Sequence, residues 1–404
     1  MRIDRADYLE INKLVTRLSI ALILFALIQP KYPYSIPFSL ILAMLVSYKN
    51  PIVERLWKRF LFLGLPKLST EEQKLLQAID ALSKYKTRST SWNDRRRVLF
   101  RRMPWRHQSI AIKLGFPARI NDVQKCINEN SKLTESVIEM VRSEYGLPLS
   151  CPPDLATEDN IRVIETLCHY ARDWSSLGDV EVQPLTDYIK NSITKTLNQD
   201  ALRKTNVIVP GSGLGRISHE LALLPFHSVH SVEYSTLMYL FNKFVYSDSP
   251  KTYKVYPFAH SYSHHVETKD QQRSIDFTQL PEKPTNLHIH NQDFNEFTLP
   301  SHPKNLVIVT AFFLDTAENM LEYFDTIDAL MNSATGTKLW INMGPLKYGT
   351  AARVEFSYEE LKALLSQYGW KLIDEQDPKL LGYLTNLKGL WQGNYGVTMW
   401  TATK

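Results

Sequence analysis

Two stretches near the amino terminus are uncharged, unlike the rest of the chain. Residues 18–28 hold one polar side chain, Ser19, and residues 32–48 continue without charge after Gln29-Pro30-Lys31. Each run is at or below the length that spans a bilayer as a helix, about 17–25 residues. Basic residues flank both outer ends, and the positive-inside rule then places both ends on the cytoplasmic side. The pattern fits a short hairpin that dips into a membrane, or a buried helical pair in a soluble protein.

Apolar residues at helical spacing dominate residues 69–147. Ser69 with Glu72 three residues later predicts a capping box at the start of the first helix. Two further helices are predicted around residues 120–127 and 137–141. This part of the chain is therefore expected to be helical throughout.

Strand-like and helical segments alternate in the carboxy-terminal half. After a linker rich in proline at 147–153 and a helix at 160–174, strands are expected at 207–209, 228–232, 287–290, 306–310, 338–342, 370–373 and 396–402. Helices are expected at 214–224, 237–246, 317–331 and 357–367. Such alternation implies an α/β fold with a seven-stranded, doubly wound, mostly parallel sheet of the Rossmann-like kind.

The pattern divides the chain into three parts. Residues 1–66 are the hydrophobic hairpin and a basic linker, 67–150 a helical region, and 151–404 the α/β domain. Residues 249–286 are polar and rich in histidine, and they are expected to form an insertion loop between the second and third strands. A chain of 404 residues agrees with one large domain plus additions.

Charge and cysteine content exclude several classes of protein. The net charge is +5, and the positive charge gathers between Arg95 and Arg106. No nucleic-acid binding is expected. The basic cluster is either a solvated helix face or a surface for a membrane or an anionic ligand. Three cysteines without CxxC spacing argue against disulfides and structural zinc and favour a reducing compartment. Since the histidines show no metal-ligand spacing such as HExxH, no metal is expected.

A glycine-rich turn follows the first strand of the α/β part. Residues 207–216 read Val-Ile-Val-Pro-Gly-Ser-Gly-Leu-Gly-Arg, which predicts a buried strand, a turn and the start of a helix. Glycines let the backbone adopt positive φ and approach a ligand closely. Glu233 ends the next strand, where an acidic residue can accept both hydroxyls of a ribose. Together they predict a pocket for an adenosine-containing cofactor.

The ends of later strands supply further candidates, because ligands of open α/β sheets lie beyond the carboxyl ends of the strands. Asp293 and Phe294 follow the third strand. They can bind the adenine amine and cover the ring, or they are a turn aspartate beside a core phenylalanine. Asp315 follows the fourth strand, and it either faces a substrate nitrogen or caps the next helix.

Two cofactors compete for this pocket. A dehydrogenase would place the pyrophosphate of a dinucleotide on the helix N-terminus, whereas a methyltransferase would bind S-adenosylmethionine. The glycines have the spacing G-x-G-x-G, and Arg216 occupies the third-glycine position of the dinucleotide pattern. This disfavours pyrophosphate. The seven strands, with no clear helix between the last two, favour the methyltransferase.

Five strings of residues occur in order along the chain. They are Ala-Arg-Asp-Trp-Ser at 171–175, the glycine turn at 209–216, Asp293-Phe294, Phe-Phe-Leu-Asp-Thr-Ala at 312–317 and Trp-Ile-Asn-Met-Gly-Pro-Leu at 340–346. This set resembles the carnosine N-methyltransferase family, S-adenosylmethionine-dependent transferases that convert carnosine to anserine. The resemblance covers roughly residues 70–404 and implies a cytoplasmic catalytic domain. Residues 1–66 have no counterpart in it.

The resemblance implies a role for each matched residue. Arg172 would bind the cofactor carboxylate, for which a bidentate guanidinium is suited, unless it pairs with Asp173 or a neighbouring acid. The other residues implied to bind the cofactor are His169, Gly211, Gly213, Glu233, Asp293, Phe294 and Ala311. Asp315 and Tyr395 would contact the imidazole dipeptide, with Asp315 as the catalytic residue.

Two positions depart from the family pattern. His169 replaces a glutamine, and Gly349, after Tyr348, replaces a histidine that helps to grip the substrate. Losing that imidazole costs on the order of 1 kcal/mol if a buried partner stays unpaired. We therefore expect methyl transfer, with attack by a neutral imidazole nitrogen, more firmly than carnosine as the acceptor. A protein histidine or another small amine, and a membrane-associated cofactor-binding protein without activity, remain the alternatives. The sequence does not define the oligomeric state.

Overall fold

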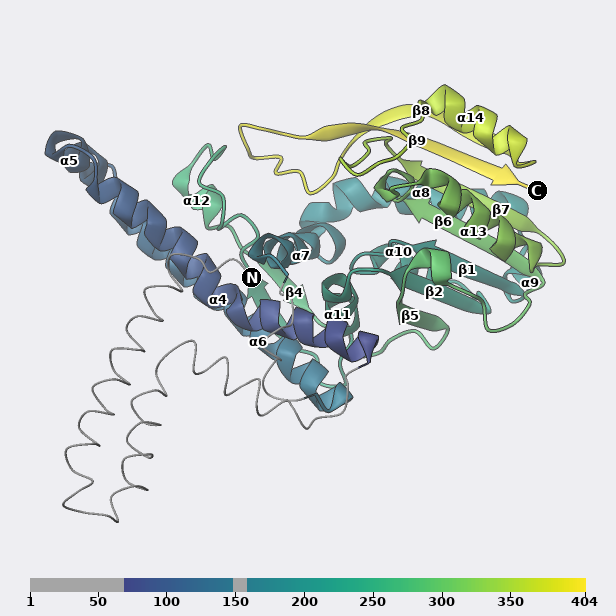
Figure 1. Cartoon of the computed structure of the whole chain (residues 1–404), viewed down its shortest axis with the longest axis horizontal. Coiled ribbons are helices and arrows are strands. Elements are labelled where there is room, and N and C mark those ends of the chain that lie inside the picture. The colour runs from purple at the N-terminus through teal and green to yellow at the C-terminus, as the bar shows by residue number, and fades with distance from the viewer. Residues whose placement is uncertain (1–68, 148–157) are drawn as a thin grey trace, which may run out of the picture. The chain divides into compact units, whose positions relative to one another are not determined.

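The computed structural model describes residues 69–147 and 158–404 (Figure 1). The uncharged runs within residues 18–48 lie outside these ranges, so the predicted membrane hairpin is not part of the described structure. Within the two ranges, no helix combines the length and the apolar character needed to cross a membrane. Within the described ranges, residues 78–147 and 158–404 pack as one compact unit.

A seven-stranded sheet forms the centre of the α/β part. Its strands are β1 (Thr205–Pro210), β2 (Ser228–Glu233), β5 (Leu287–Asn291), β6 (Asn305–Ala311), β7 (Lys338–Gly344), β8 (Lys371–Gly382) and β9 (Asn394–Thr403). Their order is β5-β2-β1-β6-β7-β9-β8. The first five strands in this order pair in parallel, and β9 pairs antiparallel to β7 and β8. All seven predicted strands are confirmed.

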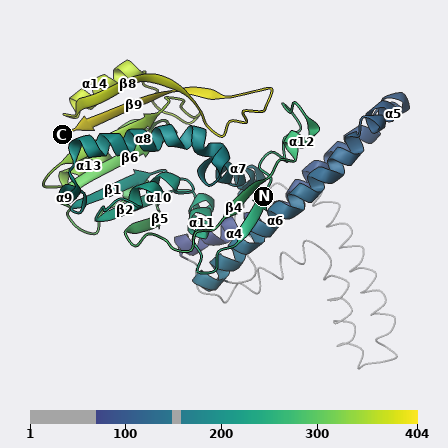
Figure 2. The ribbon, with the colours of Figure 1, turned by 180° about the vertical axis from the view of Figure 1, so that it is seen from behind.

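Helices cover both faces of the sheet, as the doubly wound prediction requires (Figures 1 and 2). The helices are α7 (Asn160–Asp173), α8 (Asp179–Thr196), α9 (Gln199–Leu202), α10 (Arg216–Ala222), α11 (Thr236–Phe244), α13 (Met320–Asn332) and α14 (Tyr358–Gln367). Side chains of α13 and α14 join one hydrophobic cluster with Trp340 and Trp400. Those of α8 and α10 join a second cluster on the other face. Helix α8 is absent from the sequence prediction, and it contains Pro184.

The helical region contains α4 (Thr70–Arg101), α5 (Trp105–Lys113) and α6 (Phe116–Tyr145). The predicted capping box is present, because Ser69 N–H donates to Glu72 at 2.7 Å and Glu72 N–H donates to Ser69 Oγ at 3.2 Å. The prediction of two separate helices at 120–127 and 137–141 is wrong, since the single helix α6 runs through both segments. The polar residues between them do not interrupt it. Asn130, for example, is buried and donates to the Tyr256 carbonyl at 3.1 Å.

The insertion between β2 and β5 is not the loop that its polar composition suggests. It contains β3 (Thr252–Val255), α12 (Thr268–Gln271) and β4 (Ile275–Thr278), and β3 pairs antiparallel with β4. Ile275 and Phe277 are buried while Asp276 and Thr278 are exposed, which is the alternation of a half-buried strand. Phe277 packs on Tyr170 of α7 with ring centroids 4.1 Å apart.

Candidate functional site

The glycine turn leaves β1 after Pro210 and enters α10 at Arg216. Gly211 has φ of 60°, a conformation that side chains with a Cβ rarely adopt. A Cβ on Gly211 would also lie 2.5 Å from the Phe313 ring. Glycine is therefore required at this position both by backbone conformation and by space. The turn has the close-approach geometry that the sequence predicts.

Glu233 ends β2 and is buried beside this turn. One of its carboxylate oxygens accepts the Gly213 N–H at 2.8 Å, and the other accepts the Ser235 N–H at 2.8 Å. Burial raises the pKa of Glu233. Because each carboxylate oxygen can accept more than one hydrogen bond, both retain capacity for a ligand hydroxyl. The structure thus brings the predicted glutamate and glycine together.

The string 171–175 ends α7 and packs against the same turn. Trp174 Nε1 donates to the Leu214 carbonyl at 2.9 Å, and Arg216 donates to the Asp173 carbonyl at 2.9 Å. Residues 171–175 and the glycine turn lie apart in the sequence, but these contacts join them in the folded protein.

Arg172 and His169 point into this corner from α7. Arg172 Nη1 donates to Asp173 Oδ1 at 2.7 Å, and its Nε lies 3.5 Å from Glu181 Oε2. The pairing with neighbouring acids, one of the two predicted interpretations of Arg172, is therefore present. The Tyr383 ring lies 4.7 Å from the guanidinium. His169 is buried, and its Nδ1 lies 3.8 Å from Asp173 Oδ2, which is beyond hydrogen-bond distance.

Asp293 and Phe294 follow β5, whose last residue Asn291 pairs with Glu233 in the sheet. Asp293 Oδ1 accepts the Asn295 N–H at 2.9 Å and caps the short helix η3 (Phe294–Glu296). Phe294 is buried in the hydrophobic core. The turn and core roles are thus observed, and they leave both residues at the same sheet edge as Glu233.

Phe312, directly after Ala311 at the end of β6, belongs to a matched string, but the sequence analysis gave it no role of its own. Its φ is 52°, a left-handed conformation that is strained for a residue with a side chain. Its N–H donates to the Met343 carbonyl at 2.8 Å, and a Cβ on Gly344 would lie 3.2 Å from this nitrogen. Strained backbone of this kind gathers at functional sites. The Phe312 ring contacts Tyr383, with centroids 4.8 Å apart.

Asp315 and Tyr395 both contact Lys347, which follows β7, and the three residues are called here the acceptor corner. Asp315 lies in the short helix η4 (Leu314–Thr316) and is 8% exposed. Its Oδ2 accepts the Lys347 N–H at 2.9 Å, while Lys347 Nζ donates to the Tyr395 hydroxyl at 3.4 Å. Burial raises the pKa of Asp315. Asp315 does not cap the next helix, because Asn319 caps α13.

Gly349 lies beyond this corner and is exposed. A Cβ built there would meet no atom within 4 Å. Nearby, the Tyr348 hydroxyl donates to the Phe356 carbonyl at 2.8 Å. The departure from the family pattern is therefore a missing side chain in open space, and the fold does not prevent a larger residue at this position.

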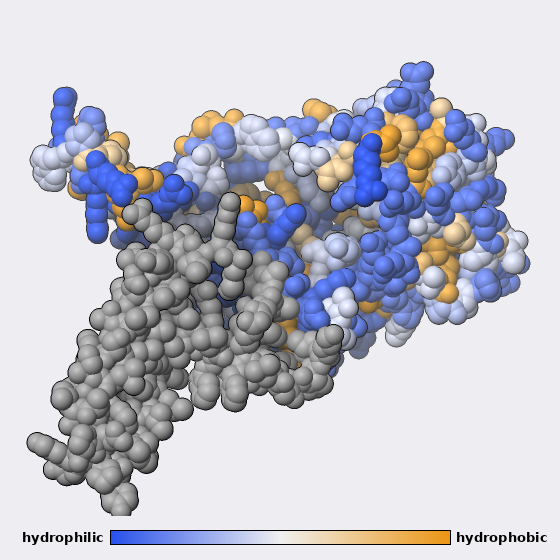
Figure 3. Space-filling model, viewed as in Figure 1, coloured by the Kyte–Doolittle hydropathy of each residue, from blue (hydrophilic) through white to orange (hydrophobic). Residues whose placement is uncertain are grey.

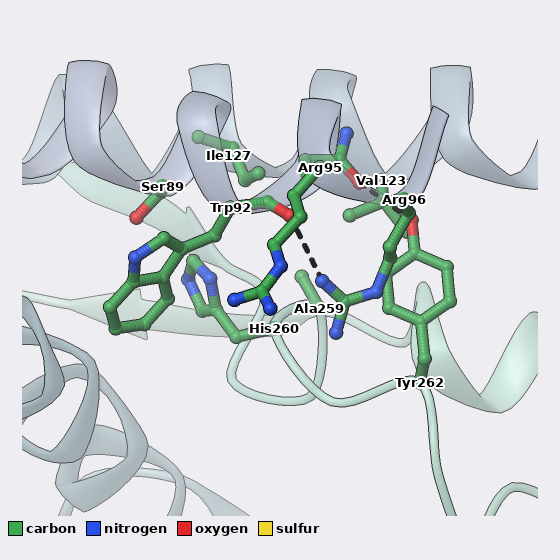
Figure 4. A pocket seen from close by; sticks show the side chains of 10 residues that line it. Ser89, Trp92, Arg95, Arg96, Val123, Ile127, Ala259, His260 and Tyr262 are labelled. Carbon is green, nitrogen blue, oxygen red and sulfur yellow. Dashed lines mark hydrogen bonds between the residues drawn. The ribbon is translucent and has the colours of Figure 1, made fainter. Parts of the chain in front are cut away.

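A cavity of about 240 Å³ lies between α4, α6 and residues 259–262 (Figure 4). His260 lies half-buried in its wall, with Nε2 2.9 Å from the Tyr85 hydroxyl, and desolvation lowers its pKa to about 4. Arg96, from the basic cluster, donates to the Trp92 carbonyl and lies 4.0 Å over the Tyr262 ring. Part of the basic cluster is therefore structural.

No group of three or more His, Cys, Asp or Glu in the described ranges is placed to hold a metal ion.

Known proteins are similar to this chain in sequence. A profile of the carnosine N-methyltransferase family matches residues 153–404. The chain belongs to the carnosine N-methyltransferase family. It is 28% identical to the carnosine N-methyltransferase of Rattus norvegicus over 359 residues, which are 83% of this chain and 86% of the rat protein. The Schizosaccharomyces pombe enzyme is 27% identical over 342 residues, 75% of this chain and 88% of that protein.

An uncharacterized protein of Saccharomyces cerevisiae is 32% identical over 284 residues. The match covers 67% of this chain and 60% of the yeast protein, so the chain spans less than two thirds of that relative. A solved magnesium protoporphyrin IX methyltransferase of Synechocystis covers 55% of this chain and 79% of its own, at 12% identity and a TM-score of 0.32. So low a score supports no conclusion. Family membership and the seven-stranded sheet make this protein an N-methyltransferase enzyme.

Proposed function

We propose that the protein transfers a methyl group from S-adenosylmethionine to an imidazole nitrogen of carnosine or a related histidine-containing dipeptide. The observation that supports this most directly is the corner of Asp315, Lys347 and Tyr395 at the carboxyl ends of β6 and β7. It offers a buried carboxylate and a phenol to an acceptor that carries an N–H group. Membership of the carnosine N-methyltransferase family supports methyl transfer. The contacts of Asp315, Lys347 and Tyr395 support an imidazole as the methyl acceptor.

The sheet edge fits the co-substrate on its own evidence. The positive φ of Gly211 and the buried carboxylate of Glu233 form a cradle for an adenosine group, where a Cβ on Gly211 would collide with Phe313. We propose that Gly213 and Ala311 line the same pocket and that Asp293 and Phe294 hold the adenine. Arg172 would bind the carboxylate of the methionine part of S-adenosylmethionine, using N–H groups that do not contact Asp173 or Glu181. His169 would lie beside it.

The chain's part in the reaction is positioning and charge stabilisation. The co-substrate supplies an electrophilic methyl group, which bonds to the nitrogen lone pair as the carbon–sulfur bond breaks. A neutral imidazole is available near pH 7, so no strong base is needed to start. Asp315 would accept the N–H of the other ring nitrogen and stabilise the positive charge that develops on the ring. Its buried position strengthens this interaction, because little water competes for the carboxylate.

The open space at Gly349 favours a second acceptor, a histidine within a protein. Gly349 lies beside the corner of Asp315, Lys347 and Tyr395, and the open space there leaves room for a polypeptide that continues beyond the imidazole. We also propose that residues 18–48 associate with a membrane and that the catalytic part lies in the cytoplasm.

One experiment separates these proposals. The purified full chain is incubated with S-adenosylmethionine and carnosine, and methylated product is read by mass spectrometry. In parallel, a cell extract is incubated with the protein and radiolabelled co-substrate. Methylated carnosine supports the first proposal. Labelled protein without methylated dipeptide supports the second. Binding of S-adenosylmethionine by calorimetry with no product in either arm would contradict both.

A further inference from the structure

A larger cavity, of about 630 Å³, adjoins the candidate site at Arg172. Its walls come from α7, from residues 257–265 and from residues 383–393, which link β8 to β9 and are called here the β8–β9 loop. Figure 3 shows the hollow, with hydrophobic side chains in its wall, in the region where Figure 1 places α12 and this loop. Sites that hold small molecules measure about 300–1,000 Å³. The cavity has the size of a ligand site.

Of the residues proposed for the co-substrate and the imidazole, the cavity shares Arg172 alone among its described lining residues. Its described lining includes Arg172 and Glu181 but neither Glu233, from the glycine-turn side, nor Asp315 and Tyr395. It therefore borders the candidate site without being part of it. A group bound there would belong to a molecule that extends past Arg172.

The near end of the β8–β9 loop is fixed to the candidate site. Glu181 accepts the Leu384 N–H at 2.9 Å and the Thr385 N–H at 2.8 Å, and the same carboxylate lies 3.5 Å from Arg172 Nε. Leu384 has φ of 54°, so the loop turns sharply where it is held. One carboxylate thus joins the wall of the cavity to the candidate co-substrate residue.

The far end of the loop is fixed to the insertion. Leu390 N–H donates to the His264 carbonyl at 2.8 Å. Nearer the start of the loop, Arg273 of the insertion donates to Asn386 Oδ1 at 2.9 Å. With both ends held, the cavity exists before any ligand arrives. Preformed sites avoid the entropic cost of ordering a loop on binding.

A row of aromatic rings leads from the imidazole corner to this cavity. The Phe312 ring lies 6.3 Å from Tyr395 and 4.8 Å from Tyr383, measured between centroids. Tyr383 directly precedes Leu384, which lines the cavity. The three rings therefore connect Tyr395 to the residue that precedes the wall of the cavity.

The wall of the cavity is mainly apolar and also holds three cationic side chains, Arg172, Arg273 and Lys388. Of these, Arg172 is ion-paired with Asp173. Ile164, Phe258, Leu387 and Trp391 are among its apolar residues. Arg273 also lines it and lies 4.4 Å over the Phe258 ring, and its buried Nε has no hydrogen-bond partner among the described residues. A buried donor without an acceptor is costly, and a carboxylate is the acceptor that a guanidinium pairs with best.

We propose that this cavity binds the part of the methyl acceptor that follows the reacting histidine, an apolar residue whose neighbouring carboxylate pairs with Arg273. This rests on the proposed methyl transfer to imidazole. The acceptor is then a histidine-containing peptide extended at its carboxyl end by an apolar residue. The carboxylate is that of the peptide's own terminus or of an acidic side chain one residue further.

The test compares short peptides as substrates of the full chain. β-Alanyl-histidyl-phenylalanine is expected to have a KM at least about tenfold below that of β-alanyl-histidyl-glycine, since burying the ring removes apolar surface from water. Amidating the phenylalanine peptide should remove most of this advantage. If an amidated peptide with aspartate after phenylalanine restores it, the carboxylate comes from a side chain.

Matched variants locate the effect. Leu387→Ala and Trp391→Ala remove apolar wall and should raise the KM for the phenylalanine peptide about tenfold, with little change for the glycine peptide. Leu390→Ala is the control, because Leu390 lies on the same loop and is exposed like Leu387 and Trp391 but is not among the described lining residues. Arg273→Gln keeps an N–H for Asn386 but should abolish the preference for acid over amide, and Arg273→Lys should restore part of it.

Calorimetry of peptide binding separates this inference from the proposed reaction. If no peptide is methylated but the phenylalanine peptide binds the wild type more tightly than Leu387→Ala, methyl transfer fails and the cavity proposal stands. Equal binding by wild type, Leu387→Ala and Trp391→Ala overturns the proposal. So does an equal KM for the phenylalanine and glycine peptides in the wild-type enzyme.

Discussion

Replacing Asp315 by asparagine tests the acceptor corner while keeping its shape. The asparagine oxygen can still accept the Lys347 N–H, which Asp315 Oδ2 now accepts at 2.9 Å. What is lost is the negative charge next to the imidazole ring. A hydrogen bond to a charged group contributes about 1.5–3 kcal/mol, and about 1.4 kcal/mol corresponds to a tenfold change in rate. We expect kcat/KM to fall by about 10- to 150-fold.

The same change should not destabilise the fold. Burial raises the pKa of Asp315 above its usual 3.8, so the folded state disfavours the ionised form. This penalty grows as pH rises from the unfolded pKa through the folded one, and it is fully present above both. Asparagine removes it. The free energy of unfolding at pH 7, from urea denaturation, should therefore equal or exceed that of the wild type.

The assay is steady-state methylation of carnosine, with the affinity for S-adenosylmethionine measured by calorimetry. Asp377→Asn on the exposed face of β8 is the matched control and should leave kcat/KM unchanged. The reasoning is refuted if Asp315→Asn keeps kcat/KM within about twofold of the wild type while co-substrate affinity is intact. A large loss of stability would instead assign Asp315 a structural role.

Three further predictions concern the acceptor, the glycine turn and acid stability. Gly349→His adds an imidazole in open space, so it should lower the KM for carnosine by about fivefold with no change in thermal midpoint, and an unchanged KM contradicts this. Gly211→Ala should lower the free energy of unfolding by about 1–3 kcal/mol and weaken co-substrate binding in calorimetry, because φ is positive and the Phe313 ring lies in the way. Burial lowers the pKa of His230 to about 3 and of His260 to about 4 from the usual 6.5. The unfolded chain therefore binds protons that the folded chain does not, and stability should fall below about pH 6.5, by about 2 kcal/mol per histidine at pH 5. Urea titrations should show a weaker pH dependence for His260→Gln, and an identical dependence would disprove the assignment.

The predictions that failed share a physical cause. The single helix α6 was predicted as two because residues between its apolar stretches are polar, yet Asn130 pairs with the Tyr256 carbonyl inside the fold. The insertion was predicted as a loop, but Ile275 and Phe277 bury their side chains once Tyr170 of α7 is beside them. Each error arises where a distant partner changes what the local pattern favours.

Several members of the candidate site also had no usable signal in the sequence. Tyr383 and Glu181 are single residues in unremarked segments, and they matter because both contact Arg172. Phe312 belongs to a matched string, but nothing in that string shows its positive φ. Such features depend on contacts made only after folding.

The sequence by itself determined the seven strands, the glycine turn with Glu233 one strand later, and membership of the carnosine N-methyltransferase family. Hydrophobic periodicity, turn chemistry and motif spacing are local properties, so a linear pattern carries them. Only the tertiary structure decided that Asp315 meets Tyr395 through Lys347 and that the β8–β9 loop closes a cavity against α7. These meetings depend on the order β6-β7-β9-β8 in the sheet, which places residues far apart in the chain at one edge.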